Sequence, residues 1–347
     1  MIIERFDPRT DTARLRACYE IVAAGWPVDR PNEPMWTFET FTGDWAYGFG
    51  ADPQQAWLAT DEAARPVGCY LLRLPERENT TMGDCLLAVA PDVRHAGWGT
   101  QLLAHCAEQT RIAGRDRLSA EVRDGSAGAS FAAAAGATGG IAEVIRVLDV
   151  GGELPARLPA LRTEAASHAV GYSLVSWTGR TPEQYLDDIV RLEGAMADAP
   201  HDPGVETWNW DADRIRKSED VMFSHGIGRY TVAARHDVSG QLAAYTAVGT
   251  EAGTPDWGFQ FGTMVLAGHR GHRLGLLVKV VMLEWLIEAE PAIRRILTGN
   301  AGANAHMIAI NEQLGFAVAD TYRSWELDLR ARPATISAVP GSARAQS

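Results

Sequence analysis

The sequence predicts an α/β protein (α+β in the arrangement of its sheet) built from two similar halves. Each half is expected to be a mixed, mostly antiparallel sheet flanked by helices. The chain has 347 residues, more than a single core usually holds. Short apolar runs typical of strands alternate with stretches of helical periodicity. The same order of elements occurs twice, about 170 residues apart, as an internal duplication would produce.

The first half begins with an alternating strand at residues 2–6 and an amphipathic helix over 11–25. Residues 27–45 mix Pro, Trp and Phe without a period, which predicts a loop with short helical turns. The remaining expected elements are strands at 56–60, 67–75, 85–91 and 117–122 and helices at 97–113 and 128–137.

Residues 151–169 contain a Gly-Gly pair and two prolines, and we expect them to be a linker, with a partly helical stretch as the alternative. In the second half, Thr181 can cap a helix that has Pro182 in its first turn. The predicted boundaries are 1–150 for the first domain, 151–169 for the linker, 170–330 for the second domain and 331–347 for a disordered tail. The other elements expected after the linker are strands at 171–179, within 229–248, 262–268, 294–299 and 324–329, and helices at 274–288 and up to residue 314.

Charge and composition restrict the partners. The net charge is −12, and an acidic protein repels nucleic acid and anionic lipid, whereas it suits a small cationic substrate. No apolar run reaches the roughly 18 residues of a membrane helix, and the N-terminus lacks the apolar segment of a signal peptide. The four cysteines lack metal-ligand spacing, which favours buried thiols and no metal. We therefore expect a cytoplasmic monomer or homodimer with neither membrane nor nucleic-acid partner.

Two strand-to-helix junctions carry the clearest functional signal. The first reads LLAVAPDVRHAGWGT and the second reads GTMVLAGHRGHRLGLL. In each, an apolar strand leads through an Arg and a glycine-bearing loop into a long helix. Glycines let main-chain N–H groups approach an anion closely, and a helix N-terminus adds unpaired donors and partial positive charge. Such a loop suits a diphosphate. It matches neither the dinucleotide-binding fingerprint nor the phosphate-binding loop of nucleotide triphosphatases.

The first junction, from Arg94 to Gly99, resembles the Q/R-x-x-G-x-G/A signature of the GCN5-related N-acetyltransferase (GNAT) superfamily. The second, from Arg270 to Gly275, departs from it once, because Arg273 stands where the first glycine is expected. A positive φ at a residue other than glycine costs roughly 1 kcal/mol. The tandem arrangement is similar to that of mycothiol synthase and related two-domain acetyltransferases.

The resemblance implies that both junctions hold acetyl-CoA or another acyl-CoA as co-substrate. Thr263–Val265 and Leu87–Val89 would then lie beside the thioester. The cofactor-binding residues that it implies are Val89, Arg94, His95, Ala96, Gly97, Trp98, Gly99 and Thr100 in the first half and Val265, Arg270, Gly271, His272, Arg273, Leu274, Gly275 and Asn304 in the second.

The segment NAGANAHMIAINEQLGF, residues 300–316, extends the resemblance through Asn304 and the Leu-Gly-Phe ending. In the family a Tyr on this helix protonates the departing thiolate. Asn311 occupies that position here and Ala132 occupies it in the first half. An amide cannot deliver a proton at neutral pH, but it can donate a hydrogen bond to the sulfur.

The catalytic candidates are Thr263, Asp198, His201 and Asn311, all in the second half, which we predict to be the reactive one. Asp198 and His201 lie in the loop expected to border the acceptor cleft, where either can activate an amine. Each has a structural alternative: Asp198 as a helix-end or turn residue, and His201 as a solvated loop histidine. Weaker candidates are Glu206, His225 and Tyr230, and Asp84 in the first half.

The predicted function is N-acyl transfer from acetyl-CoA to a small amine. The acidic run between Asp187 and Asp213 favours a cationic acceptor. Two alternatives stay open, a degenerate acyl-CoA-binding sensor or scaffold and a protein lysine acetyltransferase. Neither the acceptor nor the length of the acyl chain follows from the sequence.

Overall fold

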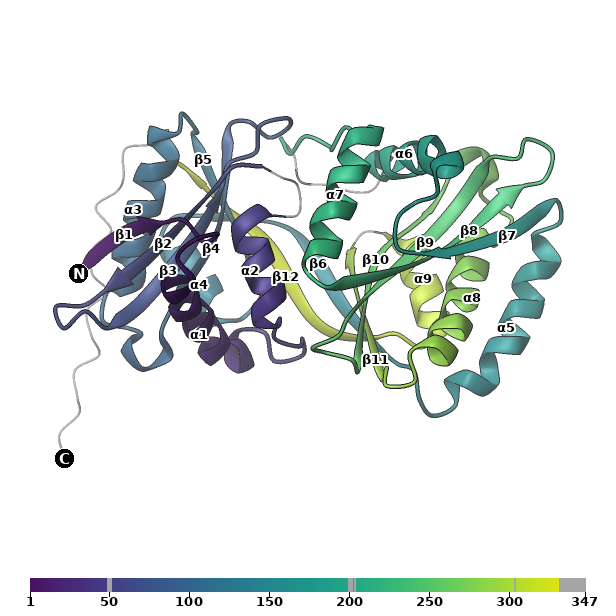
Figure 1. The fold of residues 1–347 in the computed structure, drawn as a ribbon, viewed down its shortest axis with the longest axis horizontal. Coiled ribbons are helices and arrows are strands. Elements are labelled where there is room, and N and C mark those ends of the chain that lie inside the picture. The colour runs from purple at the N-terminus through teal and green to yellow at the C-terminus, as the bar shows by residue number, and fades with distance from the viewer. Residues whose placement is uncertain (49–51, 199–201, 203, 303, 331–347) are drawn as a thin grey trace.

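A computed structural model of the protein describes residues 1–48, 52–198, 202, 204–302 and 304–330. These residues form a 12-stranded sheet with helices packed on it (Figure 1). The pairing is antiparallel except between β4 and β5 and between β10 and β11. This arrangement confirms the predicted fold class.

The first six strands come with four α-helices. In order these elements are β1 (Ile2–Phe6), α1 (Thr12–Asp29), α2 (Phe38–Tyr47), β2 (Gln54–Thr60), β3 (Pro66–Arg73), β4 (Met82–Val89), the 3-10 helix η1 (Pro91–Val93), α3 (Trp98–Ile112), β5 (Arg117–Arg123), α4 (Ala127–Ala134) and β6 (Thr138–Asp149).

The second six strands repeat this plan. The elements are α5 (Leu154–His168), β7 (Tyr172–Thr178), η2 (Glu183–Tyr185), α6 (Leu186–Gly194), η3 (Ala195–Asp198), α7 (Ala212–Ser224), β8 (Ile227–His236), β9 (Leu242–Glu251), β10 (Trp257–Val265), η4 (Ala267–His269), α8 (Leu274–Ala289), β11 (Arg295–Ala301), α9 (Ala305–Leu314) and β12 (Ala317–Asp328).

The strand order shows how the two halves are related. It is β1-β2-β3-β4-β5-β12-β6-β11-β10-β9-β8-β7. Adding six to the numbers of β1 to β5, and exchanging β12 for β6, gives the other half read from the opposite edge. The sheet therefore has internal two-fold pseudosymmetry, as expected for two copies of one six-stranded unit.

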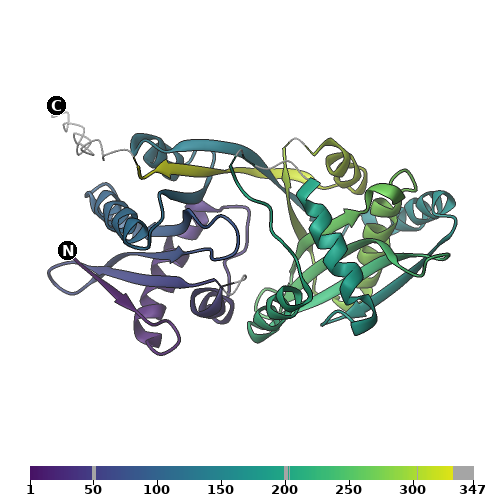
Figure 2. The ribbon, with the colours of Figure 1, turned by 90° about the horizontal axis from the view of Figure 1, so that it is seen from above.

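The sixth strand of each unit is exchanged. Strand β6 pairs with β11 of the second unit, and β12 pairs with β5 of the first. The two exchanged strands also pair with each other at the centre of the sheet. Figure 2 shows them as two long strands that join the halves. The predicted domain boundaries at residues 150 and 170 stay a prediction. Each unit takes its sixth strand from the other side of these boundaries.

Each unit has helices on both faces of its sheet. In the first, Cys69 and Leu71 pack under α1 and α2, whereas Tyr70 and Leu72 pack under α3. This alternation follows the two-residue period of a strand. In the second unit, α6 and α7 cover one face and α5 and α8 cover the other. The first two turns of α8, from Leu274 to Val280, are buried on all sides, as expected for a helix surrounded by protein.

The stretch 151–169, expected to be a linker with a possible helical part, is mostly helical, and its role as a linker stays a prediction. Its helix α5 packs against α8, with Leu154, Leu158 and Ala165 buried. These spacings of four and seven residues fall on one helix face. Pro155 sits in the first turn, where no N–H partner is needed.

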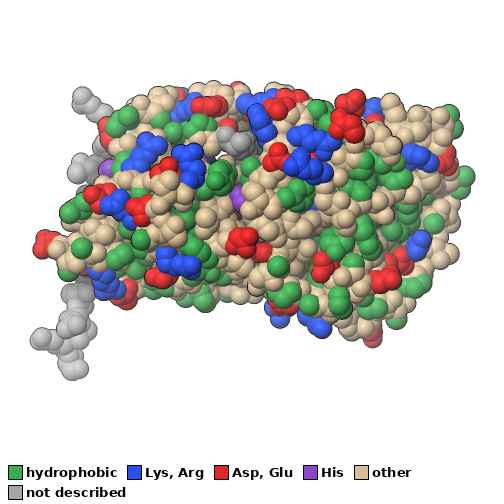
Figure 3. Space-filling view, viewed as in Figure 1, with side chains coloured by type: hydrophobic (Ala, Val, Ile, Leu, Met, Phe, Trp, Pro, Cys, Tyr) green, Lys and Arg blue, Asp and Glu red, His purple; other side chains and the backbone are tan. Residues whose placement is uncertain are grey.

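The surface carries charges of both signs. On the face shown in Figure 3, acidic and basic side chains are interspersed. The net charge of −12 is therefore not gathered into one acidic field on that face. Among the residues that the structure describes, no helix has the length and apolarity needed to cross a membrane.

Candidate active site

The two strand-to-helix junctions have the same backbone conformation. In the first, β4 leads through η1 to α3, with His95 at φ +64° and Gly97 at φ +84°. In the second, β10 leads through η4 to α8, with Gly271 at φ +87° and Arg273 at φ +52°. Gly97 and Arg273 cap the two helices. The glycine is therefore the second positive-φ residue of the first junction but the first positive-φ residue of the second junction. The strain expected at Arg273 is thus present.

Both junctions leave main-chain donors exposed at a helix start. No side chain caps α3 or α8, so their first N–H groups are not satisfied by a cap residue. A Cβ added to Gly97 would meet no atom within 4 Å, which leaves the space above the loop open. Successive main-chain donors in a turn that contains left-handed residues can form an anion-binding concavity. Main-chain donors at a helix start can bind an anion such as a diphosphate.

The arginines of the junctions are already engaged. Arg94 forms a two-pronged pair with Asp29, at 2.7 and 3.1 Å, and its Nε donates to the Val89 carbonyl oxygen. Arg273 pairs with Glu164 on α5. With Arg94 and Arg273 in these pairs, the exposed main-chain N–H groups are donors that remain for an anion, and Arg94 braces the loop against the end of α1.

Beyond each junction the parallel strands separate. Strands β4 and β5 pair from Met82 to Asp84, after which β4 continues unpaired on that side to Val89. Strands β10 and β11 pair from Trp257 to Phe259, and β10 continues to Val265. Each unit therefore has a V-shaped opening between its fourth and fifth strands that points toward its junction.

Only the second opening has a β-bulge at its edge. On β10, Gln260 pairs with Val248 and Gly262 with Ala247, which leaves Phe261 outside the ladder. The β3–β4 ladder runs from Arg73 to Gly68 without a shift. A bulge turns main-chain groups out of the ladder and is frequent beside active sites.

The predicted Thr263 lies next to this bulge. Its Oγ1 is 2.8 Å from Oγ1 of Thr246 on β9. Val265, further along β10, lies within 3.5 Å of where a Cβ on Gly275 would be. The strand thus connects the bulge to the start of α8 through close contacts.

A partly buried carboxyl group lies near the bulge, and sequence reasoning did not single it out. Glu193, at the end of α6, accepts a 2.8 Å hydrogen bond from the Tyr245 hydroxyl group. Burial raises the pKa of Glu193, while Arg229 and the Tyr245 hydrogen bond oppose this rise. A Cβ on Gly262 would lie 2.8 Å from the Tyr245 oxygen, so this glycine permits the contact.

The predicted Asp198 and His201 follow Glu193 closely in the chain. Asp198 ends the short helix η3, and His201 lies outside the described residues. Their predicted roles are not tested. Glu193 lies within the acidic run between Asp187 and Asp213, and this position was the signal available in the sequence.

Asn311 is fully buried and belongs to a chain of polar side chains. Its Oδ1 accepts a 2.7 Å hydrogen bond from Lys279 on α8, and its Nδ2 donates over 2.6 Å to Oδ1 of Asn300 on β11. Asn304 caps α9 by accepting from the Met307 N–H group. Asn304 is thereby engaged at the helix start that leads to Asn311.

The corresponding positions of the first unit are apolar. Lys279 and Leu103 both lie six residues after their helix caps. In the β11–β6 ladder, Asn300 is opposite Val144. Val122 is opposite Arg323 at the equivalent place in the β5–β12 ladder, so Asn300 corresponds to Val122. Gly275 faces Ile310 where Gly99 faces Phe131, so Asn311 corresponds to Ala132. The polar chain therefore occurs in one unit only.

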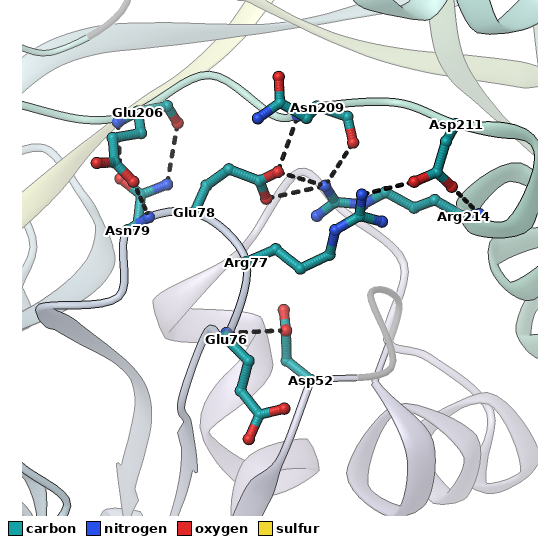
Figure 4. A network of polar contacts seen from close by, with 9 residues as sticks. All are labelled: Asp52, Glu76, Arg77, Glu78, Asn79, Glu206, Asn209, Asp211 and Arg214. Atoms are coloured by element: carbon teal, nitrogen blue, oxygen red, sulfur yellow. Dashed lines mark hydrogen bonds and ion pairs between the residues drawn. The ribbon is translucent and has the colours of Figure 1, made fainter.

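A polar network fastens the two units together beside the second site (Figure 4). Arg214 on α7 forms a buried pair with Glu78 at 2.8 Å. Glu206 and Asn79 exchange hydrogen bonds, and Arg77 pairs with Asp211. Glu206, a weak catalytic candidate in the sequence, thus anchors the segment between α6 and α7 to the first unit.

Comparisons with known proteins agree with this architecture. Residues 15–133 match the model of the Acetyltransferase (GNAT) family. A solved tandem GNAT protein from the clavulanic acid biosynthesis pathway has 28% sequence identity and a TM-score of 0.82, covering 95% of this chain and 99% of its own. No curated protein matches the sequence significantly.

Two further solved structures share the fold alone. A GCN5-related N-acetyltransferase from Sphaerobacter thermophilus is 16% identical with a TM-score of 0.64, covering 95% of this chain and 96% of its own. The GCN5-related glucosamine N-acetyltransferase region of a fungal multi-domain GH3 β-N-acetylglucosaminidase is 14% identical with a TM-score of 0.63. It covers 94% of this chain and 38% of its own.

Proposed function

Because this chain carries an acetyltransferase domain of the GNAT family and has a tandem GNAT fold, we propose that it is an acyl-CoA-dependent N-acyltransferase. The observation that carries the proposal is the second unit's opening, where an anion-binding junction, a bulged strand and a carboxyl group of raised pKa converge. The donor is proposed to be acetyl-CoA, and the acceptor a small, cationic amine.

Bound acyl-CoA supplies an activated thioester, and the junctions supply its anchorage. The main-chain N–H groups at the starts of α3 and α8 are suited to the diphosphate. The predicted residues from Arg94 to Thr100 and from Arg270 to Gly275 would surround it. Arg94 and Arg273 position these loops through Asp29 and Glu164.

We place the reaction in the second unit. The bulge around Phe261 lies on the strand that borders the opening, where a main-chain N–H donor would stabilise the negative charge that develops on the thioester oxygen. Thr263 keeps the following stretch of β10 tied to Thr246. The first unit lacks this bulge in its regular β3–β4 ladder.

Glu193 is the proposed general base. A carboxylate whose pKa is raised by burial holds a proton more readily, which suits removal of a proton from an attacking amine. Tyr245 holds the carboxylate through its hydroxyl group. Asp198 and His201 remain sequence candidates for the same role or for binding the acceptor.

A small acceptor suits the border of the site better than a protein does. The segment between α6 and α7 is anchored to the first unit through Glu206–Asn79, and α7 is anchored to it through Arg214–Glu78. A protein lysine requires an open groove, which a fastened segment narrows. Within the acidic run, Asp188 and Asp211 already pair with arginines, so the proposed cation preference rests on the remaining carboxyl groups.

The proposal is tested by incubating the full chain with acetyl-CoA and a panel of amines while free thiol is measured. Amine-dependent thiol release with matching N-acetylated product is expected, and Glu193→Gln should slow it strongly. Tight acetyl-CoA binding without turnover by any amine would instead indicate a sensor or scaffold. Acetylation of co-expressed proteins but of no small amine would indicate a lysine acetyltransferase.

A further inference from the structure

The chain of Lys279, Asn311 and Asn300 spans three elements of the second unit, α8, α9 and β11. Lys279 is 2% exposed and Asn311 is 0% exposed. Asn300 is partly exposed, and it lies beyond Leu297, the last β11 residue paired with β10. The chain therefore begins in the core and ends in the part of β11 that borders the opening.

The direction of the hydrogen bonds follows from the chemistry of lysine. An ammonium group has donors only, so the Asn311 atom that faces it must be the amide oxygen. The Asn311 nitrogen is then the atom that faces Asn300, whose oxygen must accept. The amide nitrogen of Asn300 stands at the end of the chain, and neither of its N–H donors is used by the hydrogen bond to Asn311.

A donor chain of this kind strengthens its last member. Each hydrogen bond polarises the next amide group, and the effect is larger where water is excluded. A positive charge at the buried end makes the terminal N–H groups better donors. They would favour an acceptor that carries negative charge.

Lys279 is an unusual choice at this position. The chain has 32 basic residues, of which only Lys217 and Lys279 are lysines. No ion pair joins Lys279 to any residue in the described part of the chain. Its ammonium group faces the Asn311 oxygen and lies 4.9 Å from the centre of the Phe316 ring. Such a cation lacks a countercharge until an anion arrives nearby.

We propose that Asn300 contacts the coenzyme sulfur in the second unit and stabilises the departing thiolate, with Asn311 and Lys279 as positioning residues. This inference rests on the proposed function. In the step concerned, the amine nitrogen bonds to the acyl carbon and the carbon–sulfur bond breaks with its electron pair on sulfur. The amine proton passes to Glu193. Lys279 takes no part in this proton transfer and holds the Asn311 oxygen at the far end of the chain.

Burial lowers the pKa of Lys279 to about 7. The group therefore changes charge close to neutral pH, and a thiolate at the other end of the chain would favour its charged form. An arginine could not titrate in this range. The first unit has Leu103, Ala132 and Val122 at the three positions, so it has no equivalent chain.

The test is the pKa of the thiol of CoA bound to the full chain, followed by the ultraviolet absorbance of the thiolate during a pH titration. In the wild-type protein we expect one bound thiol to titrate about one pH unit or more below free CoA, because hydrogen bonds to a charged form favour it. Lys279→Met and Asn300→Ala should return that value to that of free CoA. Lys217→Met, at the exposed lysine, should leave it lowered.

Three outcomes overturn the inference. A bound thiol with the pKa of free CoA in the wild-type protein would do so while leaving the proposed function intact. So would a lowered pKa that persists in both Lys279→Met and Asn300→Ala. Failure of the wild-type protein to bind CoA at all would overturn the inference and the proposed function together. Since Asn300 is partly exposed, its variant provides the test even if Lys279→Met fails to fold.

Discussion

The two units of this protein share a backbone but differ in what borders their openings. The first has a glycine at the left-handed cap of α3, a regular fourth strand and apolar side chains at the end of its opening. The second has the strained Arg273 at the equivalent cap, a bulged strand and the chain from Lys279 to Asn300. The first unit, which matches the family signature better, thus has fewer polar side chains beside its opening. After a duplication, coenzyme anchorage and chemistry need not be retained by the same copy.

The largest effect is expected from removing the proposed base of the second unit. Glu193→Gln should lower kcat by roughly 10²–10⁴-fold, the usual contribution of a general base. Because burial raises the pKa of Glu193, the wild-type rate should rise with pH through a value above the ordinary pKa of 4.5, and this limb should vanish in the variant. Steady-state kinetics over a pH series measures both.

Asp84→Asn provides the matched change in the first unit, since Asp84 lies on β4 at the start of that opening. It should alter kcat little. A greater loss of kcat from Asp84→Asn than from Glu193→Gln would reverse the assignment of roles to the two units.

A second prediction concerns the fastening between the units. Arg214→Met should lower the free energy of unfolding by roughly 3–5 kcal/mol, because it leaves the Glu78 carboxylate buried without its partner. Arg77→Met, which removes the exposed pair with Asp211, should cost at most about 1 kcal/mol. Chemical denaturation measures both, and equal losses would mean that burial does not distinguish the two pairs.

The buried lysine gives a third prediction, in which the effect depends on pH. The pKa of Lys279 is 10.5 ordinarily and about 7 in the folded protein, so the unfolded chain binds the proton more strongly between these values. The charge therefore destabilises the fold fully below pH 7, and this destabilisation disappears as the pH rises toward 10.5.

Lys279→Met should consequently raise the free energy of unfolding by a few kcal/mol at pH 6, at roughly 1.4 kcal/mol per unit of pKa difference. The gain should shrink steadily at higher pH. Thermal denaturation of both proteins over this pH range measures it. A gain that is constant with pH would show that Lys279 does not titrate in the folded protein.

The smallest effect is expected at the two helix caps. Arg273→Gly should stabilise the second junction by up to about 1 kcal/mol, because glycine adopts φ +52° without strain. Loss of the exposed pair with Glu164 reduces the gain slightly. Gly97→Ala, at φ +84°, should destabilise the first junction by about 1 kcal/mol. If both substitutions shift stability in the same direction, the two caps are not equivalent.

Much of the fold could be predicted from local sequence patterns. The apolar runs around 85–91 and 262–268 became β4 and β10, and the glycine-bearing loops after them lead into α3 and α8 as expected. The four cysteines are buried and free, in agreement with their apolar surroundings. These features depend on short-range periodicity and on the steric demands of turns.

What could not be predicted depends on long-range pairing. Strand β6 was not recognised, and its exchange with β12 has no local signature, because a strand reads the same whichever neighbour it pairs with. Helix α2 was taken for part of a loop, although Thr37 caps it. The helix expected to begin after Thr181 begins at Leu186 instead, after a short 3-10 turn.

The residues of the site that belong to a sequence motif could be predicted, whereas those that depend on tertiary contacts were missed. Asn311 was singled out through its place in a motif, whereas its partner Lys279 lies in an apolar helix where a lone charge has no evident role. Glu193 acquires its raised pKa only when α6 packs over Tyr245. The sequence neighbouring Lys279 or Glu193 does not indicate that either side chain is buried.

The most direct test of the central claim, that the second unit carries the chemistry, is a crystal structure of the full chain with acetyl-CoA. The account predicts the thioester oxygen about 3 Å from a main-chain N–H group of the bulge around Phe261, with the sulfur facing Asn300. A thioester found only beside β4 of the first unit, or coenzyme at neither junction, would contradict it.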